Sequence, residues 1–200
     1  LCAFVAFTII DEFYRGTNAI RRKRGYSFFY SLIYLISRNR SRYGGYIVHL
    51  GIVMMFIGFT GKAFEQKFDV LLTKNVPETI ENYEITLLNI HHLNRSQRAN
   101  HEAQTIELKV VNLESNRIQH IKPERRSYLI DGQVVDHPEV SVMSRLNEDL
   151  YVVLGTTDIA NNKATVLVQI NPMVSWVWIG ILTLFIGSLI CLIPRKKEFI

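Results

Sequence analysis

Twenty consecutive residues near the end of the chain, 174–193, read VSWVWIGILTLFIGSLICLI and contain no charged side chain. An α-helix needs about 20 predominantly apolar residues to cross the roughly 30 Å hydrocarbon core of a bilayer. The length and the composition of this stretch therefore predict a membrane-spanning helix. Trp176 and Trp178 stand at its beginning, where their amphipathic rings would favour the membrane–water interface.

A second apolar block covers residues 43–64 and reads YGGYIVHLGIVMMFIGFTGKAF. No charge lies between Arg42 and Lys62, and His49 is the single histidine in that interval. This block also predicts a membrane span. The first ten residues, LCAFVAFTII, are too few to span and lack an initiator Met and a basic leader. We therefore expect residues 1–10 to be the end of a truncated transmembrane helix of a longer protein.

The charges are distributed unevenly along the chain. Residues 62–173 carry a net charge of −3, whereas the segments on either side together carry +8. Cationic segments are retained on the cytoplasmic side of a membrane. We therefore expect residues 11–42 to be a cytoplasmic basic loop and 194–200 a cytoplasmic tail. The basic composition is then explained by the membrane topology, because the basic residues keep the flanking segments on the cytoplasmic side. Nucleic-acid binding is not expected.

The basic loop contains an aromatic-rich run, residues 26–36, that reads YSFFYSLIYLI. Eleven residues are too few to span a bilayer. Arginines flank the run, and this pattern is typical of a helix that lies at the inner membrane interface. A re-entrant or partner-packed segment is the alternative.

The residues between the two spans follow a different pattern. From about residue 68 to 169, apolar and polar residues alternate in short runs such as TIELKVVNL and ATVLVQI, which predicts β-strands. Six or so strands in about a hundred residues predict a small antiparallel barrel or sandwich. The expected fold is a membrane α-helical protein with a small all-β periplasmic domain, residues 65–172, inserted between two transmembrane helices, 43–64 and 173–193.

Glycines and cysteines agree with this organisation. Gly44, Gly51 and Gly58 recur every seven residues, and Gly180 and Gly187 do the same in the second span. Seven residues is about two helical turns, so each set predicts a stripe on which another helix packs closely. The β-region has no cysteine, so no disulfide framework is expected there. No Cys-x-x-Cys-His motif is present for covalent haem attachment.

His49 is the candidate functional residue. An imidazole within a bilayer costs free energy unless it is paired, so it suggests a functional site. At about 100° per residue it faces away from the glycine stripe. Gly45 leaves space beside it, and Ile52, Val53 and Phe56 would supply an apolar wall. Neutral imidazole is a good ligand for haem iron, and a hydrogen bond to a neighbouring helix is the alternative.

The other histidines lack the spacing of metal ligands. His91 and His92 are adjacent, so on a strand they would point to opposite faces. His101, His120 and His137 are scattered through the β-region. No phosphate loop, nucleophile elbow or carboxylate pair stands out. We expect no second metal site.

The run RSRYGGYIVHLGI, residues 40–52, resembles the R-x-R-Y-G-G-Y-x-V-H-x-G signature near the C-terminus of CcmF. CcmF is the membrane haem lyase subunit of bacterial cytochrome c maturation. Supporting stretches are EFYRGT at 12–17, DLYVVLG at 149–155 and NPMVSWVWIG at 171–180. The similarity is spread over essentially all 200 residues.

The resemblance implies that His49 is an axial ligand of the iron of a membrane haem b, in a multi-pass protein of the bacterial inner membrane with its β-domain in the periplasm. It also implies an enzyme role, as a subunit that takes haem from a periplasmic haem chaperone and forms thioether bonds to an unfolded apocytochrome c. Other cytochrome c maturation subunits would be partners, and quinol would supply electrons.

In the family, the tryptophan-rich catalytic segment and the second haem ligand lie upstream of the region that these residues match, so no catalytic residue is assigned here. We further expect Arg38, Arg40 or Arg42 to pair with the propionates of the membrane haem. The alternatives are a paralogue specific for a nitrite reductase cytochrome, a non-catalytic scaffold that docks partners through the β-domain, and a simple transmembrane electron carrier.

Overall fold

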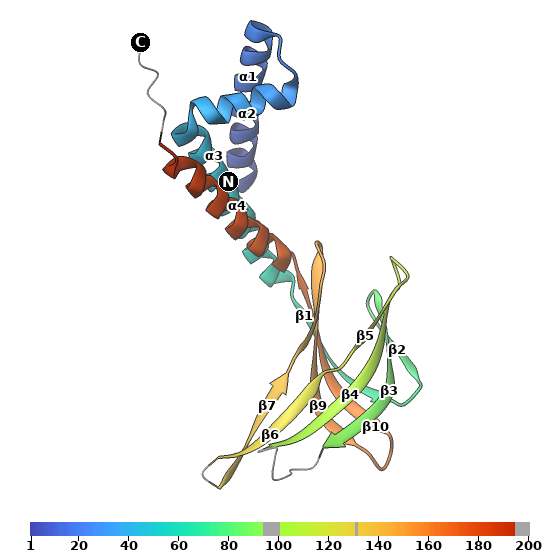
Figure 1. Cartoon of the computed structure of the whole chain (residues 1–200). Helices are drawn as coiled ribbons and strands as arrows, with labels where there is room; N and C mark the ends of the chain where they lie inside the picture. Colours follow the sequence, from blue (N-terminus) through green and yellow to red (C-terminus); the bar gives the residue numbers. More distant parts are fainter. Residues whose placement is uncertain (94–100, 131, 195–200) are drawn as a thin grey trace. The chain divides into compact units, whose positions relative to one another are not determined.

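The computed structural model describes residues 1–93, 101–130 and 132–194. The chain forms two compact units, which are coloured along the sequence in Figure 1. A helical unit comprises Leu1–Phe64 and Pro172–Ile200, and a β-rich unit comprises Glu65–Asn171. Residues 195–200, most of the expected cytoplasmic tail, lie outside the described residues.

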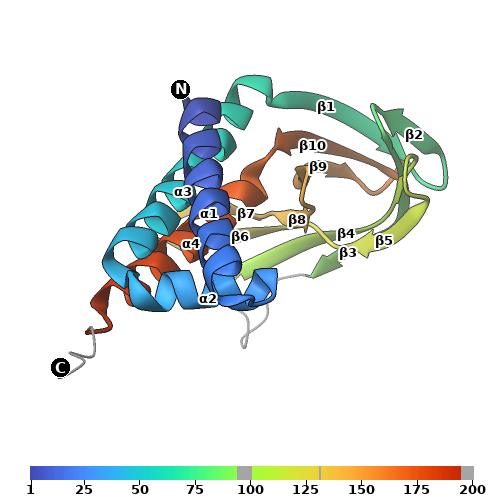
Figure 2. The ribbon, with the colours of Figure 1, turned by 90° about the horizontal axis from the view of Figure 1, so that it is seen from above.

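The described part of the helical unit consists of four α-helices and one short 3-10 helix. They are α1 (Cys2–Arg24), α2 (Phe28–Arg38), α3 (Arg40–Gly61), η1 (Lys62–Phe64) and α4 (Val174–Leu192). α3 and α4 lie side by side and run in opposite directions (Figures 1 and 2). α2 is amphipathic, because it buries Ser31 and Leu35 while Phe29 and Ile33 are exposed. One face of α2 therefore packs within the unit and the other does not.

Helix α1 is longer than the sequence suggested. The expected loop, residues 11–42, is helical from its first residue to Arg24, so treating that part as a loop was wrong. This stretch contains no proline, and Asp11 pairs with Arg15 one turn later at 2.9 Å. The helix ends at Gly25, whose φ of 70° is left-handed, and its last turn is basic. Glycine and cations both favour a helix C-terminus, so a basic segment that reads as a loop folds as a helix.

The glycine stripes of α3 and α4 pack directly against each other. A methyl group added to Gly51 would lie 2.6 Å from the backbone nitrogen of Leu184, and one added to Gly187 would lie 2.7 Å from that of Val48. Real side chains do not approach backbone so closely, so only glycine permits this contact. The predicted stripes are confirmed.

The described part of the β-rich unit contains ten strands in two sheets. The strands are β1 (Gln66–Thr73), β2 (Pro77–Ile80), β3 (Tyr83–Leu93), β4 (His101–Asn112), β5 (Arg117–Ile121), β6 (Glu124–Ile130), β7 (Gln133–Glu139), β8 (Ser141–Ser144), β9 (Glu148–Asp158) and β10 (Lys163–Pro172). One sheet has the order β1-β10-β9-β8, and the other has the order β2-β3-β4-β6-β7 with β5 also beside β4. Of the two architectures expected, the structure is the sandwich.

Fully buried aliphatic side chains from both sheets form one core. Leu72 on β1, Ile85 on β3, Leu108 on β4, Val152 on β9 and Val166 on β10 all belong to it and are inaccessible to solvent. Each lies on a strand whose inward and outward residues alternate, as the period-two pattern predicted.

The strand count exceeds the expected six because some strands carry no alternating pattern. Every residue of β7 is exposed, and so are four of the five residues of β5. A strand that buries neither face has no reason to alternate apolar and polar residues. Such strands are recognisable only from their pairing partners.

Candidate functional site

His49 lies in the middle of α3 with its side chain exposed on the helix surface. Its Nδ1 atom is 2.8 Å from the carbonyl oxygen of Gly45, one turn earlier. A carbonyl oxygen can only accept a hydrogen bond, so Nδ1 carries the proton. The lone pair is then on Nε2, at the outer end of the ring. This arrangement fixes the tautomer and the orientation of the imidazole, as is usual for histidines that bind metals.

The surroundings of His49 are open and apolar. Nothing lies within 4 Å of the position that a methyl group on Gly45 would take. Ile52 and Phe56, on the same side of the helix, are 37% and 56% exposed. Val53 was expected to join this wall, but only 6% of it is exposed. The apolar surface beside the imidazole is therefore supplied by Ile52 and Phe56. It suits a flat, apolar ligand in contact with Nε2.

Arg42 lies on the same helix face as His49, two turns and about 10 Å earlier. Its Nη2 atom is 2.7 Å from Oε2 of Glu12 on α1, and its Nε donates a 3.2 Å hydrogen bond to the hydroxyl of Tyr46. The rings of Phe13, Tyr43 and Tyr46 form an aromatic cluster beside it, with centroids 5.1 to 6.2 Å apart. These contacts hold the guanidinium in place, and its side chain is still 57% exposed.

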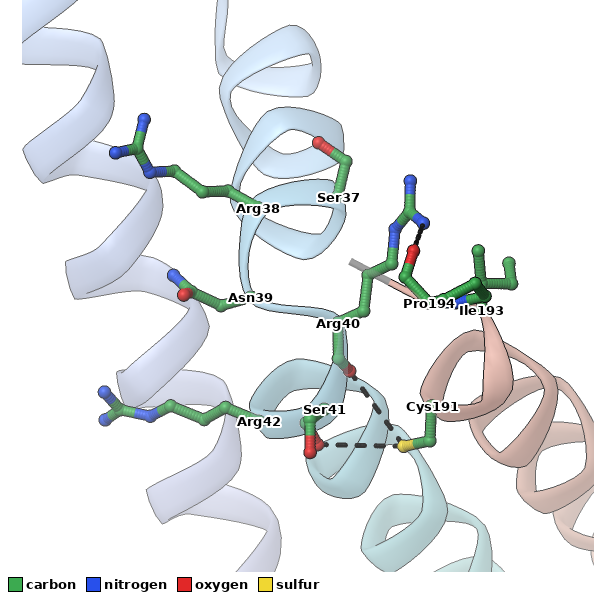
Figure 3. A pocket seen from close by; sticks show the side chains of 9 residues that line it. All are labelled: Ser37, Arg38, Asn39, Arg40, Ser41, Arg42, Cys191, Ile193 and Pro194. Atoms are coloured by element: carbon green, nitrogen blue, oxygen red, sulfur yellow. Dashed lines mark hydrogen bonds between the residues drawn. The ribbon is translucent and has the colours of Figure 1, made fainter. Parts of the chain in front are cut away.

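The other two arginines of the expected set make different contacts from Arg42. Figure 3 shows Arg38 and Arg42 directed to one side and Arg40 to the other. Arg40 donates a 3.1 Å hydrogen bond to the carbonyl of Pro194, and Arg38 donates a 3.0 Å hydrogen bond to the hydroxyl of Tyr34. The three arginines border a cavity of about 430 Å³ without converging in it. Of the two arginines that lie on α3, Arg42 shares the face of His49 and Arg40 does not.

The remaining histidines form no metal cluster within the described residues. Nε2 of His91 is 3.8 Å from a carboxylate oxygen of Glu107, and the ring of His137 packs edge-on against Tyr128 at 5.5 Å. No group of three His, Cys, Asp or Glu side chains in residues 1–93, 101–130 and 132–194 could hold an ion. The side chain of His101 lies outside this description.

The sequence pattern indicated His49 and a set of three arginines that includes Arg42, but it did not indicate the groups that orient them. The Arg42–Tyr46 contact has i,i+4 spacing, a signal that could have been used. Glu12 is 30 residues from Arg42, and no local pattern links the two. The carbonyl of Gly45 is a backbone atom, so residue identities alone could not reveal its hydrogen bond with His49.

The fold and the site together define a class of protein, a β-sandwich carried between two glycine-packed apolar helices, one of which presents an outward-facing histidine. A model of the CcmF C-terminal beta-sandwich matches residues 63–172. This match covers more than half of the chain. The chain belongs to the CcmF family.

The region that is similar to known proteins extends beyond the residues of the sandwich. The cytochrome c-type biogenesis protein CcmF of Haemophilus influenzae is 27% identical over 165 residues, which is 80% of this chain and 24% of that protein. The protein of the same name from Pseudomonas aeruginosa is 24% identical over 161 residues, 80% of this chain and 23% of its own length. The solved structure of a cytochrome c heme lyase CcmF shares the fold, with a TM-score of 0.57 at 16% identity over 94% of this chain and 34% of that structure. The chain spans about a quarter of the length of the curated relatives that it matches.

Proposed function

We propose that this chain is the C-terminal part of a cytochrome c haem lyase subunit and that His49 is an axial ligand of a haem b held within the membrane. The observation that carries the proposal is the 2.8 Å contact between Nδ1 of His49 and the Gly45 carbonyl, which leaves Nε2 available to iron. The names of the relatives, a cytochrome c-type biogenesis protein and a heme lyase, support the same function.

The proposed topology places α3 and α4 across the bacterial inner membrane. Arg40–Phe64 and Val174–Leu192 are long enough to cross and have mean hydropathies of 1.7 and 2.1. The net charges of the flanks and of the intervening residues, +8 and −3, favour a cytoplasmic location for the flanks and a periplasmic location for residues 65–172.

The residues on α3 fit one side of a haem. Nε2 of His49 would provide the bond to iron, and Ile52 and Phe56 would cover the apolar part of the ring and exclude water. Arg42, two turns away on the same face, would donate a hydrogen bond to a propionate oxygen. This hydrogen bond would either replace the contact of Arg42 with Glu12 or exist beside it. Arg40 points elsewhere, so we assign it no such role. When bound, haem b supplies one-electron chemistry whose potential depends on its ligands and its burial.

The proposed partners follow from this role. A periplasmic haem chaperone would deliver the haem that is transferred, apocytochrome c would accept it through thioether bonds, other maturation subunits would complete the complex, and quinol would supply electrons through haem b. In this scheme the task of His49 is to hold a redox centre, while thioether formation takes place on residues outside these 200.

A spectrum of the full-length protein tests the proposal. Replacing His49 by Ala should remove the b-type absorbance in a reduced-minus-oxidised spectrum and should lower cytochrome c maturation at least tenfold. His92→Ala, which changes an exposed histidine on β3, is the matched control and should change neither quantity. Unchanged absorbance in His49→Ala would exclude the ligand role. Absence of b-type absorbance from the unaltered protein would favour the scaffold alternative.

A further inference from the structure

The border strands of the two sheets are not equally protected against the addition of another strand. β8 and β2 each span only four residues, and β7 contains Pro138. β1 is different, because it spans eight residues without a proline and pairs with β10 in an unbroken register from Gln66 to Thr73. Proteins usually protect a border strand by shortening it, by a proline or by a bulge. β1 has none of these three devices. It lies at the border of its sheet, beside β10 (Figure 2).

A groove runs along the outer border of β1. It has a volume of about 480 Å³ and is bordered by residues 67–70 of β1 and by residues 78–81, at the end of β2. In an antiparallel sheet, alternate residues of a border strand direct their N–H and C=O groups away from the partner strand. Phe68 and Val70 pack against the sandwich core and are only partly buried. A strand added here would satisfy the outward backbone groups and cover both side chains.

The groove carries uncompensated negative charge. Its one cation, Lys67, is 3.4 Å from a carboxylate oxygen of Glu65. Asp69, Glu78 and Glu81 have neither a hydrogen bond nor an ion pair through their carboxylates with any residue that the structure describes. The ligand complementary to this groove is therefore an extended polypeptide that carries Lys or Arg side chains.

We propose that the outer border of β1 is a docking site for an extended, cationic polypeptide segment, which adds to the sheet as a strand beside β1. Backbone hydrogen bonds would hold the segment in place, as in other cases of strand addition, and its cations would lie near Asp69, Glu78 and Glu81. Under the proposed function the occupant is part of the unfolded apocytochrome, and only this identification rests on that function.

Amide hydrogen exchange on the full chain in detergent micelles tests the docking site. The probe is an eight-residue peptide of alternating Lys and Val, and the control peptide alternates Glu and Val. The Lys-Val peptide should slow exchange at alternate amides of β1 at least tenfold, the Glu-Val peptide should not, and β8 should be unaffected. Absence of protection on β1, or protection of β7 or β8 in its place, would overturn the proposal.

Substitutions in the groove test the role of charge. The combined change Asp69→Asn, Glu78→Gln and Glu81→Gln should weaken binding of the Lys-Val peptide roughly tenfold at low salt and flatten its salt dependence. Glu102→Gln, at an exposed acid on β4, is the control and should change binding less than twofold. Unchanged binding by the triple variant would contradict the proposal.

One further variant separates docking from haem binding. His49→Ala should leave the peptide affinity unchanged, because the probe contacts only the β-rich unit. If only haem ligation is lost, the b-type absorbance disappears and peptide binding remains. If only the docking site fails, peptide binding is absent and the b-type absorbance remains.

Discussion

The two units of this chain use apolar residues in opposite ways. In the β-rich unit a set of aliphatic side chains from both sheets points inward, and the largest members of this set are inaccessible to solvent. In α4 the only buried residues are Gly180 and Gly187, while Phe185 and Leu189 are 57% and 46% exposed. A domain surrounded by water buries side chains, whereas helices surrounded by lipid have no such need and gain from close backbone packing. The proposed membrane location of α3 and α4 follows from this contrast.

The largest effect is expected from truncation of the sandwich core. Leu108→Ala on β4 removes a side chain that is inaccessible to solvent, so it should lower the free energy of unfolding of the β-rich unit by about 2–5 kcal/mol. Leu189→Ala on α4 makes the same chemical change at an exposed position and should cost much less in detergent. Chemical denaturation of the full chain measures both. Equal costs would mean that the two units do not differ as described.

A smaller effect is expected from glycine substitution in α3. Gly51→Ala places a methyl group against the backbone of Leu184 and Gly180, so the two helices must separate, at a cost of about 1–3 kcal/mol. Gly45→Ala is the matched control, since its methyl group would meet nothing within 4 Å. Thermal unfolding of α3 and α4 in detergent distinguishes the two variants. A Gly51→Ala protein as stable as Gly45→Ala would show that the helices do not pack through glycine.

The smallest effect concerns charge in the β-rich unit. Hydrogen bonds from Lys122 at 2.6 Å and Asn89 at 3.2 Å lower the pKa of Glu107 from 4.5 to about 2. A carboxyl with a depressed pKa adds stability above its unfolded-state pKa and loses that contribution as the pH falls. This part of the stability should therefore disappear between pH 4.5 and about 2.

Denaturation midpoints measured from pH 6 to pH 2 test this expectation. Glu107→Gln should show a shallower loss of stability over this range than the unaltered chain, and Glu102→Gln should not. If the midpoints of Glu107→Gln fall with pH as steeply as those of the unaltered chain, the depressed pKa of Glu107 does not contribute to stability.

The predictability of the structure depends on the range of the interactions involved. The apolar helices α3 and α4 could be predicted because length and hydropathy are local properties. The pairing of β1 with β10 joins residues 66–73 to residues 163–170, so alternation alone could not distinguish a sandwich from a barrel. The exposed strand β7 gave no signal, because neither of its faces is buried.

The candidate site likewise has one part that the sequence could reveal and another part that it could not. His49 could be identified because an imidazole within an apolar block is expensive. The hydrogen bond to the Gly45 carbonyl and the contact of Arg42 with Glu12 depend on backbone atoms and on helix packing. These contacts determine which nitrogen of His49 faces outward and which arginine shares its face, and residue patterns do not contain that information.

Rescue by imidazole is the most direct test of the ligand assignment. Full-length His49→Ala protein is isolated, its haem content is determined, and reduced-minus-oxidised spectra are recorded with and without millimolar imidazole. If Nε2 of His49 ligates the iron beside the open space at Gly45, the variant should lose the b-type spectrum and imidazole should restore it. A variant that retains the full b-type spectrum without imidazole would contradict the account.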